Sequence, residues 1–427
     1  MTSKPKYWLY GILISVIIGV VLISGCVQQQ KPVKDQLLKE NKSEDSHFGF
    51  MHPEHFEEME ELNVYWQRPH AGPFIWDEIE PEPGQFDWVY ADEVVKESQN
   101  HDINILATLW PFAEWDQSSC HQKLPAEKTE DFGKLGEYRQ KPCNMQAYKN
   151  FVKKVVERYD GDGFEDMPEL KYPIKYWEVS NEPSMQEDLV FFKGTPEDYF
   201  EILKTTYQAV KEADPDAKVV QGGMAGLGDE ERVFWQAVLD LGGGKYFDIA
   251  NIHYVGVTPE AFDVPELKEF LEKNGLNKPF WITELQYSAM ALGEDRLSED
   301  EWAKFMIKNF VQAFNTGADK IFYIGLEESP SDPEAWLIKD SEKQETYQAF
   351  KTMVSKIDYF SSVKKLGERQ YKFIVNDKPV YVLWGTGNLP TEITGTVKVT
   401  DIHGSEMLLD VSQITLNDSP IFIEVEK

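Results

Sequence analysis

Glu182 and Glu284 each lie at the end of a short apolar segment, residues 176–182 and residues 279–284. Tyr, Trp and Val favour a strand in the first segment, and Pro183 ends it because proline cannot donate to a strand ladder. Two carboxyl groups that face each other across a cleft can cleave a glycosidic bond. One protonates the leaving oxygen, and the other attacks the anomeric carbon or activates water. The pair has this chemistry only if the fold brings the two strand ends together.

The order of segments between residues 47 and 358 predicts where those ends lie. Strand-like and helix-like stretches alternate, as in an α/β protein, and eight repeats favour a (β/α)8 TIM barrel. The predicted strands are residues 47–50, 63–67, 103–110, 176–182, 218–221, 247–254, 279–284 and 320–324, and the predicted helices are residues 53–62, 90–100, 146–159, 195–213, 229–241, 265–274, 298–316 and 342–357. In a closed barrel the ends of strands four and seven face each other across the mouth. A doubly wound sheet is the alternative, but it usually has fewer repeats and a phosphate-binding glycine loop, and we find no P-loop or Rossmann glycine pattern.

The pattern changes after residue 361. Short alternating runs are separated by turn signals at Asn376-Asp377 and His403-Gly404, which predicts a small antiparallel β domain, sandwich-like, over residues 361–427. We expect this domain to be a structural cap on the barrel, and glycan binding is the alternative.

Three stretches resemble a known group of enzymes. Residues 176–183 (YWEVSNEP) and 281–284 (WITE) are similar to the strand-four and strand-seven motifs of the retaining (β/α)8 glycoside hydrolases of clan A. Residues 76–88 (WDEIEPEPGQFDW) resemble the loop after strand two in families 39, 42 and 5 of that clan. The resemblance covers about residues 47–355 and does not specify the sugar.

The resemblance implies roles for five residues. Glu182 would be the acid/base, and Glu284 the nucleophile. Asn181 would hydrogen-bond the 2-hydroxyl of the sugar, an interaction that strengthens in the transition state. Arg68 would contact the nucleophile, and Tyr254 would donate to the same carboxylate. The acid needs a raised pKa to hold its proton near neutral pH, whereas the nucleophile needs nearby donors to stay ionised.

Other residues could line the mouth. Because neighbouring strand residues face opposite sides, we expect Tyr254 to point into the site and keep His253 as the alternative. His70 follows Arg68 by two positions and could reach the same mouth. The tryptophans Trp76, Trp110 and Trp115 are candidates for stacking on sugar faces, with a place in the core as the alternative for each. Many clan members end strand eight in a tryptophan, but this chain reads FYIGLE over residues 322–327, which leaves its sugar preference open.

The N-terminus predicts export. Lys4 and Lys6 precede an apolar run over residues 8–23, and Ser24-Gly25-Cys26 then resembles a lipobox. This resemblance implies a signal over residues 1–26 and a lipid on the sulfur of Cys26. An uncleaved single-span anchor is the alternative. Either one places the protein on the extracytoplasmic face of the membrane, followed by a polar tether over residues 27–46.

Net charge and cysteine content limit the classes of binding partner that we expect for the protein. The net charge of −31 repels nucleic acid and anionic lipid headgroups. Besides Cys26 the chain has only Cys120 and Cys143, which we expect to form a disulfide in an oxidising compartment, with two free thiols as the alternative. No spacing fits zinc ligands, and we expect neither a metal nor a cofactor.

Together these patterns predict a retaining glycoside hydrolase that cleaves β-glycosidic bonds in a carbohydrate substrate. Two alternatives remain: a catalytically inactive cell-surface glycan-binding barrel, and a transglycosylase, in which a sugar acceptor replaces water. The sequence does not decide between exo and endo action.

Overall fold

The computed structural model describes residues 42–51, 55–129, 134–186, 190–257, 264–287, 297–327 and 336–425. The predicted signal, Cys26 and most of the predicted tether lie outside these residues. Among the described residues, no helix has the length and apolar character needed to cross a membrane.

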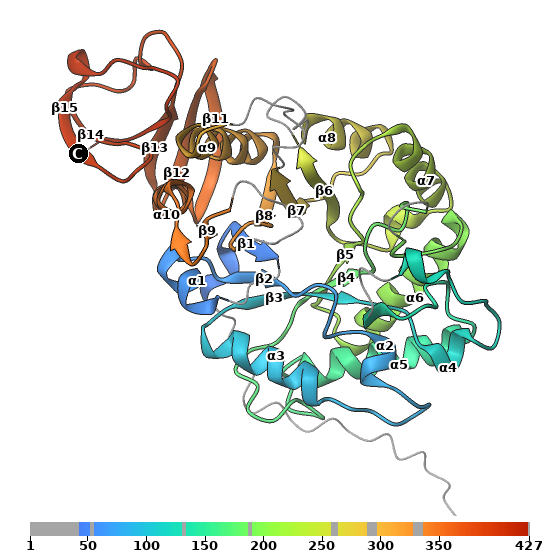
Figure 1. Cartoon of the computed structure of the whole chain (residues 1–427). Coiled ribbons are helices and arrows are strands. Elements are labelled where there is room, and N and C mark those ends of the chain that lie inside the picture. Colours follow the sequence, from blue (N-terminus) through green and yellow to red (C-terminus); the bar gives the residue numbers. More distant parts are fainter. Residues whose placement is uncertain are drawn as a thin grey trace, which may run out of the picture. The chain divides into compact units, whose positions relative to one another are not determined.

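Eight parallel strands form the centre of the fold (Figure 1). They are β1 Phe48–Met51, β2 Trp66–Arg68, β3 Asn104–Leu109, β4 Tyr176–Val179, β5 Lys218–Gln221, β6 Ala250–Val257, β7 Phe280–Tyr287 and β8 Ala318–Tyr323. The strands are hydrogen-bonded in the order β5-β4-β3-β2-β1-β8-β7-β6. Parallel bridges between Val220 and Ile249 and between Met224 and Ile252 join β5 to β6. The sheet is therefore nearly closed, and the predicted barrel is confirmed.

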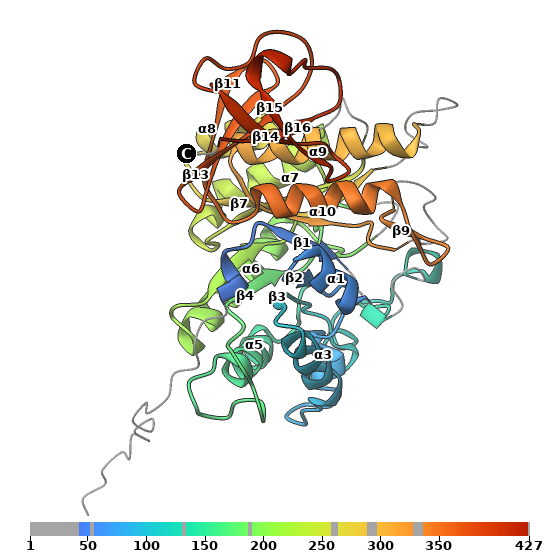
Figure 2. The same cartoon turned by 90° about the vertical axis from the view of Figure 1, so that its left-hand side faces the viewer.

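Helices surround the strands on the outside of the barrel (Figures 1 and 2). They are α1 Phe56–Leu62, α3 Val89–Asn100, α5 Met145–Tyr159, α6 Pro196–Ala213, α7 Asp229–Asp240, α8 Val264–Lys273, α9 Glu299–Thr316 and α10 Glu345–Ile357, with the short helices α2 Trp76–Ile79 and α4 Glu114–Gln117 in the loops after β2 and β3. Capping boxes start α6 at Thr195 and α9 at Ser298.

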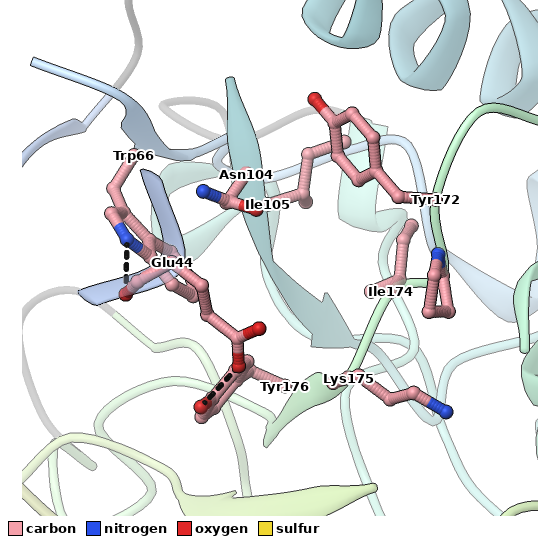
Figure 3. Close-up of a pocket in the computed structure, with 9 residues that line it drawn as sticks. Glu44, Trp66, Asn104, Ile105, Tyr172, Ile174, Lys175 and Tyr176 are labelled. Carbon is pink, nitrogen blue, oxygen red and sulfur yellow. Dashed lines mark hydrogen bonds between the residues drawn. The ribbon is translucent and has the colours of Figure 1, made fainter. Parts of the chain in front are cut away.

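The short 3-10 helix η1 (Lys42–Asp45) precedes β1, and Figure 3 shows its residue Glu44 hydrogen-bonded to Trp66 and Tyr176. The hydroxyl of Tyr176 donates to Glu44 Oε1 at 2.8 Å, and the indole of Trp66 donates to the Glu44 carbonyl at 3.1 Å. The cavity there is about 10 Å³, barely enough for one water. The tether prediction is therefore wrong for residues 42–46, because these contacts fix the turn to the barrel.

The C-terminal strands form one antiparallel sheet rather than two stacked sheets. They are β11 Phe360–Gly367, β12 Gln370–Val375, β13 Lys378–Leu383, β14 Thr396–Thr400, β15 Glu406–Asp410 and β16 Ile421–Val425, in the order β11-β12-β13-β16-β14-β15. The predicted turn between β12 and β13 has positive φ at both Asn376 and Asp377, as a two-residue hairpin requires. Ion pairs from Lys356 of α10 to Glu424 (2.7 Å) and from Lys308 of α9 to Asp418 (2.8 Å) hold the sheet against the barrel.

The loop after β3 contains the predicted disulfide. Cys120 and Cys143 are bonded, with their Cα atoms 6.0 Å apart. The carboxylate of Asp116 also accepts from the amides of Cys143 (2.7 Å) and Asn144 (3.0 Å), so the two ends of the loop are joined twice.

We expect the double variant Cys120→Ser/Cys143→Ser to lose about 3 kcal/mol of unfolding free energy, because the bond restricts the unfolded chain over a 23-residue separation. Urea unfolding of the oxidised wild type, the reduced wild type and the variant measures this loss. Reduction should lower the stability of the wild type and leave the variant unchanged. Equal midpoints for all three samples would contradict the prediction.

Candidate active site

Glu182 and Glu284 come together at the carboxyl end of the barrel. Each residue is 6% exposed. His253 lies between them, with its Nδ1 atom 2.8 Å from Glu182 Oε1 and 3.5 Å from Glu284 Oε1. One side-chain atom of each of the three residues lies within 4.8 Å of the other two. The fold therefore places the two carboxyl groups in one buried site.

The backbone changes direction just before Glu182. Strand β4 ends at Val179 because Ser180 has a left-handed conformation (φ 62°), so the strand ends before Pro183, not at it as the sequence predicted. Glu182 itself has a positive φ of 37°. Non-glycine residues in this region cost about 1–3 kcal/mol each, a cost typical of functional sites.

A strand irregularity directs Glu284 towards His253. The pairing of β6 with β7 passes from Ile252–Ile282 to His253–Glu284, so Thr283 is one extra residue in β7. Such a bulge changes the direction of the side chains that follow it. On the other side of His253, a Cβ atom on Gly223 would lie 2.0 Å from the ring nitrogen Nε2. Only glycine therefore leaves room for the imidazole in this position.

Arg68 supplies the positive charge of the site and is fully buried. Its Nη1 atom donates to Glu284 Oε1 at 2.6 Å and its Nη2 atom donates to Asn181 Oδ1 at 2.6 Å. The Nε atom donates to Glu178 Oε2 at 2.8 Å, and Nη2 lies 2.7 Å from the same oxygen. The remaining Nη1 donor faces the sulfur of Met51 at 3.4 Å. The guanidinium thus has a partner for each of its N–H groups, as burial requires.

Burial and charge separate the two carboxyl groups chemically. Burial raises the pKa of Glu182 to about 7, although the charge of Arg68 opposes the rise. Burial also raises the pKa of Glu284, and the charge of Arg68 opposes that rise. Because Arg68 forms an ion pair with Glu284, we assign the first ionisation of this coupled pair to Glu284 and the retained proton to Glu182.

His253 is neutral at physiological pH, because burial lowers its pKa to about 4. Its Nε2 atom lies 2.8 Å from Thr283 Oγ1. When Glu182 is protonated, its hydroxyl can donate to Nδ1, and Nε2–H donates to Thr283. When Glu182 is ionised, Nδ1–H donates to it, and the Thr283 hydroxyl turns from its other acceptors, Asn251 Oδ1 (2.9 Å) and Glu178 Oε1 (3.2 Å), to donate to Nε2. The tautomer of His253 therefore follows the protonation state of Glu182.

Asn181 is also fully buried, and its orientation is fixed. Because Oδ1 accepts from Arg68, Nδ2 points elsewhere, and among the described residues it has no hydrogen-bond partner. A buried donor without a partner costs about 1–3 kcal/mol. Asn181 therefore has a donor available for a ligand.

The other predicted lining residues differ in position. Trp110 and Trp76 are fully buried, which favours the alternative of a place in the core for both. Trp76 packs on Trp115 with ring centroids 5.0 Å apart, and the partly buried Trp115 donates to the Glu80 carbonyl. The buried His70 ring lies 5.4 Å from that of Trp110.

Both strand-six candidates are buried, Tyr254 at 7% exposure and His253 at 2%. His253 contacts both carboxyl groups and so has the more central place, contrary to the expectation that favoured Tyr254. Alternation along β6 requires the two side chains to face opposite sides, but it does not say which of them faces the site. The role assigned to Tyr254 stays a prediction.

The sequence analysis missed a polar layer beneath the site. Glu178 is fully buried and accepts hydrogen bonds from Thr108 (2.5 Å), Asn251 (2.7 Å) and Thr283 (3.2 Å), besides Arg68. The sequence does contain a signal for this layer, because each of these residues is a polar residue in an otherwise apolar strand.

Among the described residues, four groups of side chains have the spacing of metal ligands: Glu182 with His253 and Glu284; Glu157 with Asp160 and Asp162; Asp300 with Glu345 and His403; and Cys120 with His121 and Cys143. In the first group Arg68 already supplies a positive charge at Glu284. The second group lies at the end of α5 and in the loop that follows it. The two cysteines of the last group form the disulfide.

The chain resembles proteins of one enzyme clan. A family model described as beta-galactosidase, glycoside hydrolase family 42, matches residues 51–217, a range that includes Arg68, Asn181 and Glu182. Over this range, from the end of β1 to the residue before β5, the chain is similar to glycoside hydrolases. No curated protein matches the sequence.

Solved structures share the fold of this chain at low identity. A glucosidase from Croceicoccus marinus is 14% identical, with a TM-score of 0.59 over 90% of this chain and 96% of that one. A GH39 beta-xylosidase from Caulobacter crescentus is 14% identical, with a TM-score of 0.60 over 91% and 98%. The catalytic domain of GH30 xylanase C from Talaromyces cellulolyticus is 16% identical, with a TM-score of 0.56 over 90% and 97%.

The raised pKa of Glu182 makes stability depend on pH. The folded protein holds a proton on Glu182 up to about pH 7, whereas the unfolded chain releases it near the ordinary value of 4.5. The wild type should therefore lose stability as the pH rises from 4.5 to 7, and Glu182→Gln should not suffer this loss. We expect the stability of the variant relative to the wild type to grow by about 3 kcal/mol across this window. Urea unfolding at pH 4.5, 6 and 8 measures the difference, and a constant difference would contradict the raised pKa.

Proposed function

We propose that the protein is a retaining glycoside hydrolase that cleaves β-glycosidic bonds in oligosaccharides or polysaccharides. The observation that carries the proposal is the short separation of the carboxyl groups: oxygens of Glu182 and Glu284 lie within 4.8 Å of each other. Retaining enzymes have a separation of about 5 to 5.5 Å, whereas inverting enzymes need about 6.5 to 9.5 Å to admit water.

The first step would form a covalent intermediate. The Glu284 carboxylate attacks the anomeric carbon and forms a glycosyl ester, while protonated Glu182 gives its proton to the departing oxygen. Arg68 keeps Glu284 ionised before the attack, and the raised pKa of Glu182 keeps the proton available near neutral pH.

The second step would release the sugar. Glu182, now ionised, removes a proton from water, and the water oxygen attacks the anomeric carbon and breaks the ester to Glu284. His253 changes tautomer with each proton transfer and hydrogen-bonds Glu182 in both states. The free Nδ2 donor of Asn181 suits the 2-hydroxyl of the sugar. No step needs a cofactor.

The names of the relatives support a neutral sugar in β-linkage. They include a beta-xylosidase, a glucosidase and a family of beta-galactosidases. We infer that the substrate is a β-linked pentoside or hexoside.

Removing either carboxyl group should identify its role. We expect Glu182→Ala to lose about 10²- to 10⁴-fold in kcat/KM on substrates with poor leaving groups, and much less on activated aryl β-glycosides, which need no acid. Glu284→Ala should lose activity on all of them. Glu201→Ala, which removes an exposed carboxylate that pairs with Lys141, is the matched control and should have wild-type rates.

Azide distinguishes the two roles. In Glu182→Ala it should intercept the glycosyl-enzyme and give a β-glycosyl azide, whereas in Glu284→Ala it should replace the carboxylate and give the α-azide. Undiminished hydrolysis by either variant would refute the assignment, and a hydrolysis product of inverted configuration from the wild type would refute retention.

We also propose that the enzyme is a lipoprotein on the extracytoplasmic face of the membrane. The motif at Cys26 and the disulfide between Cys120 and Cys143 support this location, because disulfides persist in oxidising compartments.

Labelling with a fatty-acid analogue in a bacterial host should mark the full-length chain and not Cys26→Ser. The variant should also move from the membrane fraction to the soluble fraction. Equal labelling of both chains would exclude lipidation at Cys26, and an unlabelled wild type that stays in the membrane fraction would favour the uncleaved anchor.

A further inference from the structure

Glu178 is a carboxylate in the barrel interior that neither proposed reaction step uses. It is fully buried on β4, four residues before Glu182. Its Oε2 atom accepts from Arg68 Nε at 2.8 Å and from Thr108 Oγ1 at 2.5 Å, and its Oε1 atom accepts from Asn251 Nδ2 at 2.7 Å and from Thr283 Oγ1 at 3.2 Å. One side chain of β4 thus contacts residues of β2, β3, β6 and β7.

Stability alone does not explain a buried ion of this kind. Taking a carboxylate and a guanidinium out of water costs several kcal/mol each, and apolar residues of similar volume often stabilise a protein equally well or better. The interior layer around Trp66, Leu106, Val220 and Trp281 shows that this barrel can be filled with apolar side chains. The presence of the Glu178–Arg68 pair is therefore better explained by a role in the site above it than by stability.

The geometry of Arg68 supplies that reason. A guanidinium is planar and rigid, so fixing two of its nitrogens fixes the third. Glu178 holds the edge formed by Nε and Nη2. This leaves Nη1 directed at Glu284 and the second hydrogen of Nη2 directed at Asn181 Oδ1, both at 2.6 Å. The Asn181 contact in turn directs Nδ2 of that amide away from Arg68.

We propose that Glu178 is the positioning residue of the site, which fixes Arg68 so that one guanidinium nitrogen faces Glu284 and another sets the orientation of the Asn181 amide. The inference rests on the proposed glycosidase function and extends it to a residue that does not touch the sugar. Arg68 also forms ion pairs with both Glu178 and Glu284, so its single positive charge is divided between two carboxylates and does not fully neutralise the nucleophile Glu284.

The charge of Glu178 has a second effect. It contributes to the raised pKa of Glu182, after burial, and Arg68 acts in the opposite direction. Without this charge, and with Arg68 no longer shared, Glu182 should release its proton at a lower pH. The alkaline limb of the pH profile of kcat/KM should then move to lower pH.

Glu178→Gln keeps the shape of the side chain and removes its charge. We expect kcat/KM to fall by about 100-fold, the size associated with a misplacement of about 1 Å. The rate advantage of a 2-hydroxy aryl glycoside over its 2-deoxy analogue should become smaller, because Asn181 is no longer held. The alkaline limb of the pH profile of kcat/KM should lie at lower pH. Thr206→Val is the control. It removes a buried hydroxyl that bonds Tyr148 between α5 and α6, and should leave the substrate ratio and the limb unchanged.

A milder variant tests the proposal in case Glu178→Gln does not fold. Thr108→Val removes one donor to the Glu178 oxygen that holds Arg68, and should change the substrate ratio in the same direction by a smaller factor. The proposal would be overturned if folded Glu178→Gln kept the wild-type ratio of rates on the two glycosides and the wild-type alkaline limb. If Glu178→Gln does not fold, a wild-type ratio in Thr108→Val would overturn it. A wild type inactive on every glycoside would refute the proposed function itself, whereas an active wild type with inactive Glu182→Ala and Glu284→Ala would confine the failure to Glu178.

Discussion

The structure depends on a positive charge held in a dry interior. Arg68 is fully buried, and its cost of desolvation is offset only because Glu178 and Glu284 share it and Asn181 accepts a further hydrogen bond. These partners come from three segments: the middle of β4, its end and β7. The barrel brings them together because parallel strands end at the same rim. Moving any one of them would leave a buried charge without its partner.

This single cation makes two chemically similar carboxyl groups different. Burial raises the pKa of Glu182 and of Glu284, so burial alone would make both weak acids. The direct contact of Arg68 with Glu284 breaks that symmetry. The same environment that makes the site costly to fold therefore separates a proton donor from an anion.

The sequence predicted the architecture well because the barrel repeats one local pattern eight times. It placed Glu182 and Glu284 at one rim because each stands in or just after a strong strand signal, although β7 continues past Glu284 to Tyr287. It did not predict the central place of His253, because alternation along β6 does not say which of two neighbouring side chains faces the site. Nor did it predict the role of Glu178, because a buried carboxylate has meaning only with its partners on other strands. The tryptophans show the opposite limit: Trp110 directly follows β3 and Trp76 begins α2 in the loop after β2, and both have the right residue type, but packing places both in the core.

Gly223 is a determinant of the site because it has no side chain. Any side chain there would occupy the volume of the His253 ring, and His253 contacts both carboxyl groups. A survey of substitutions scored by activity would therefore rank Gly223 with the catalytic residues, although it has no functional group. In this barrel the space that a glycine leaves just after β5 is as much a part of the chemistry as the imidazole that occupies it.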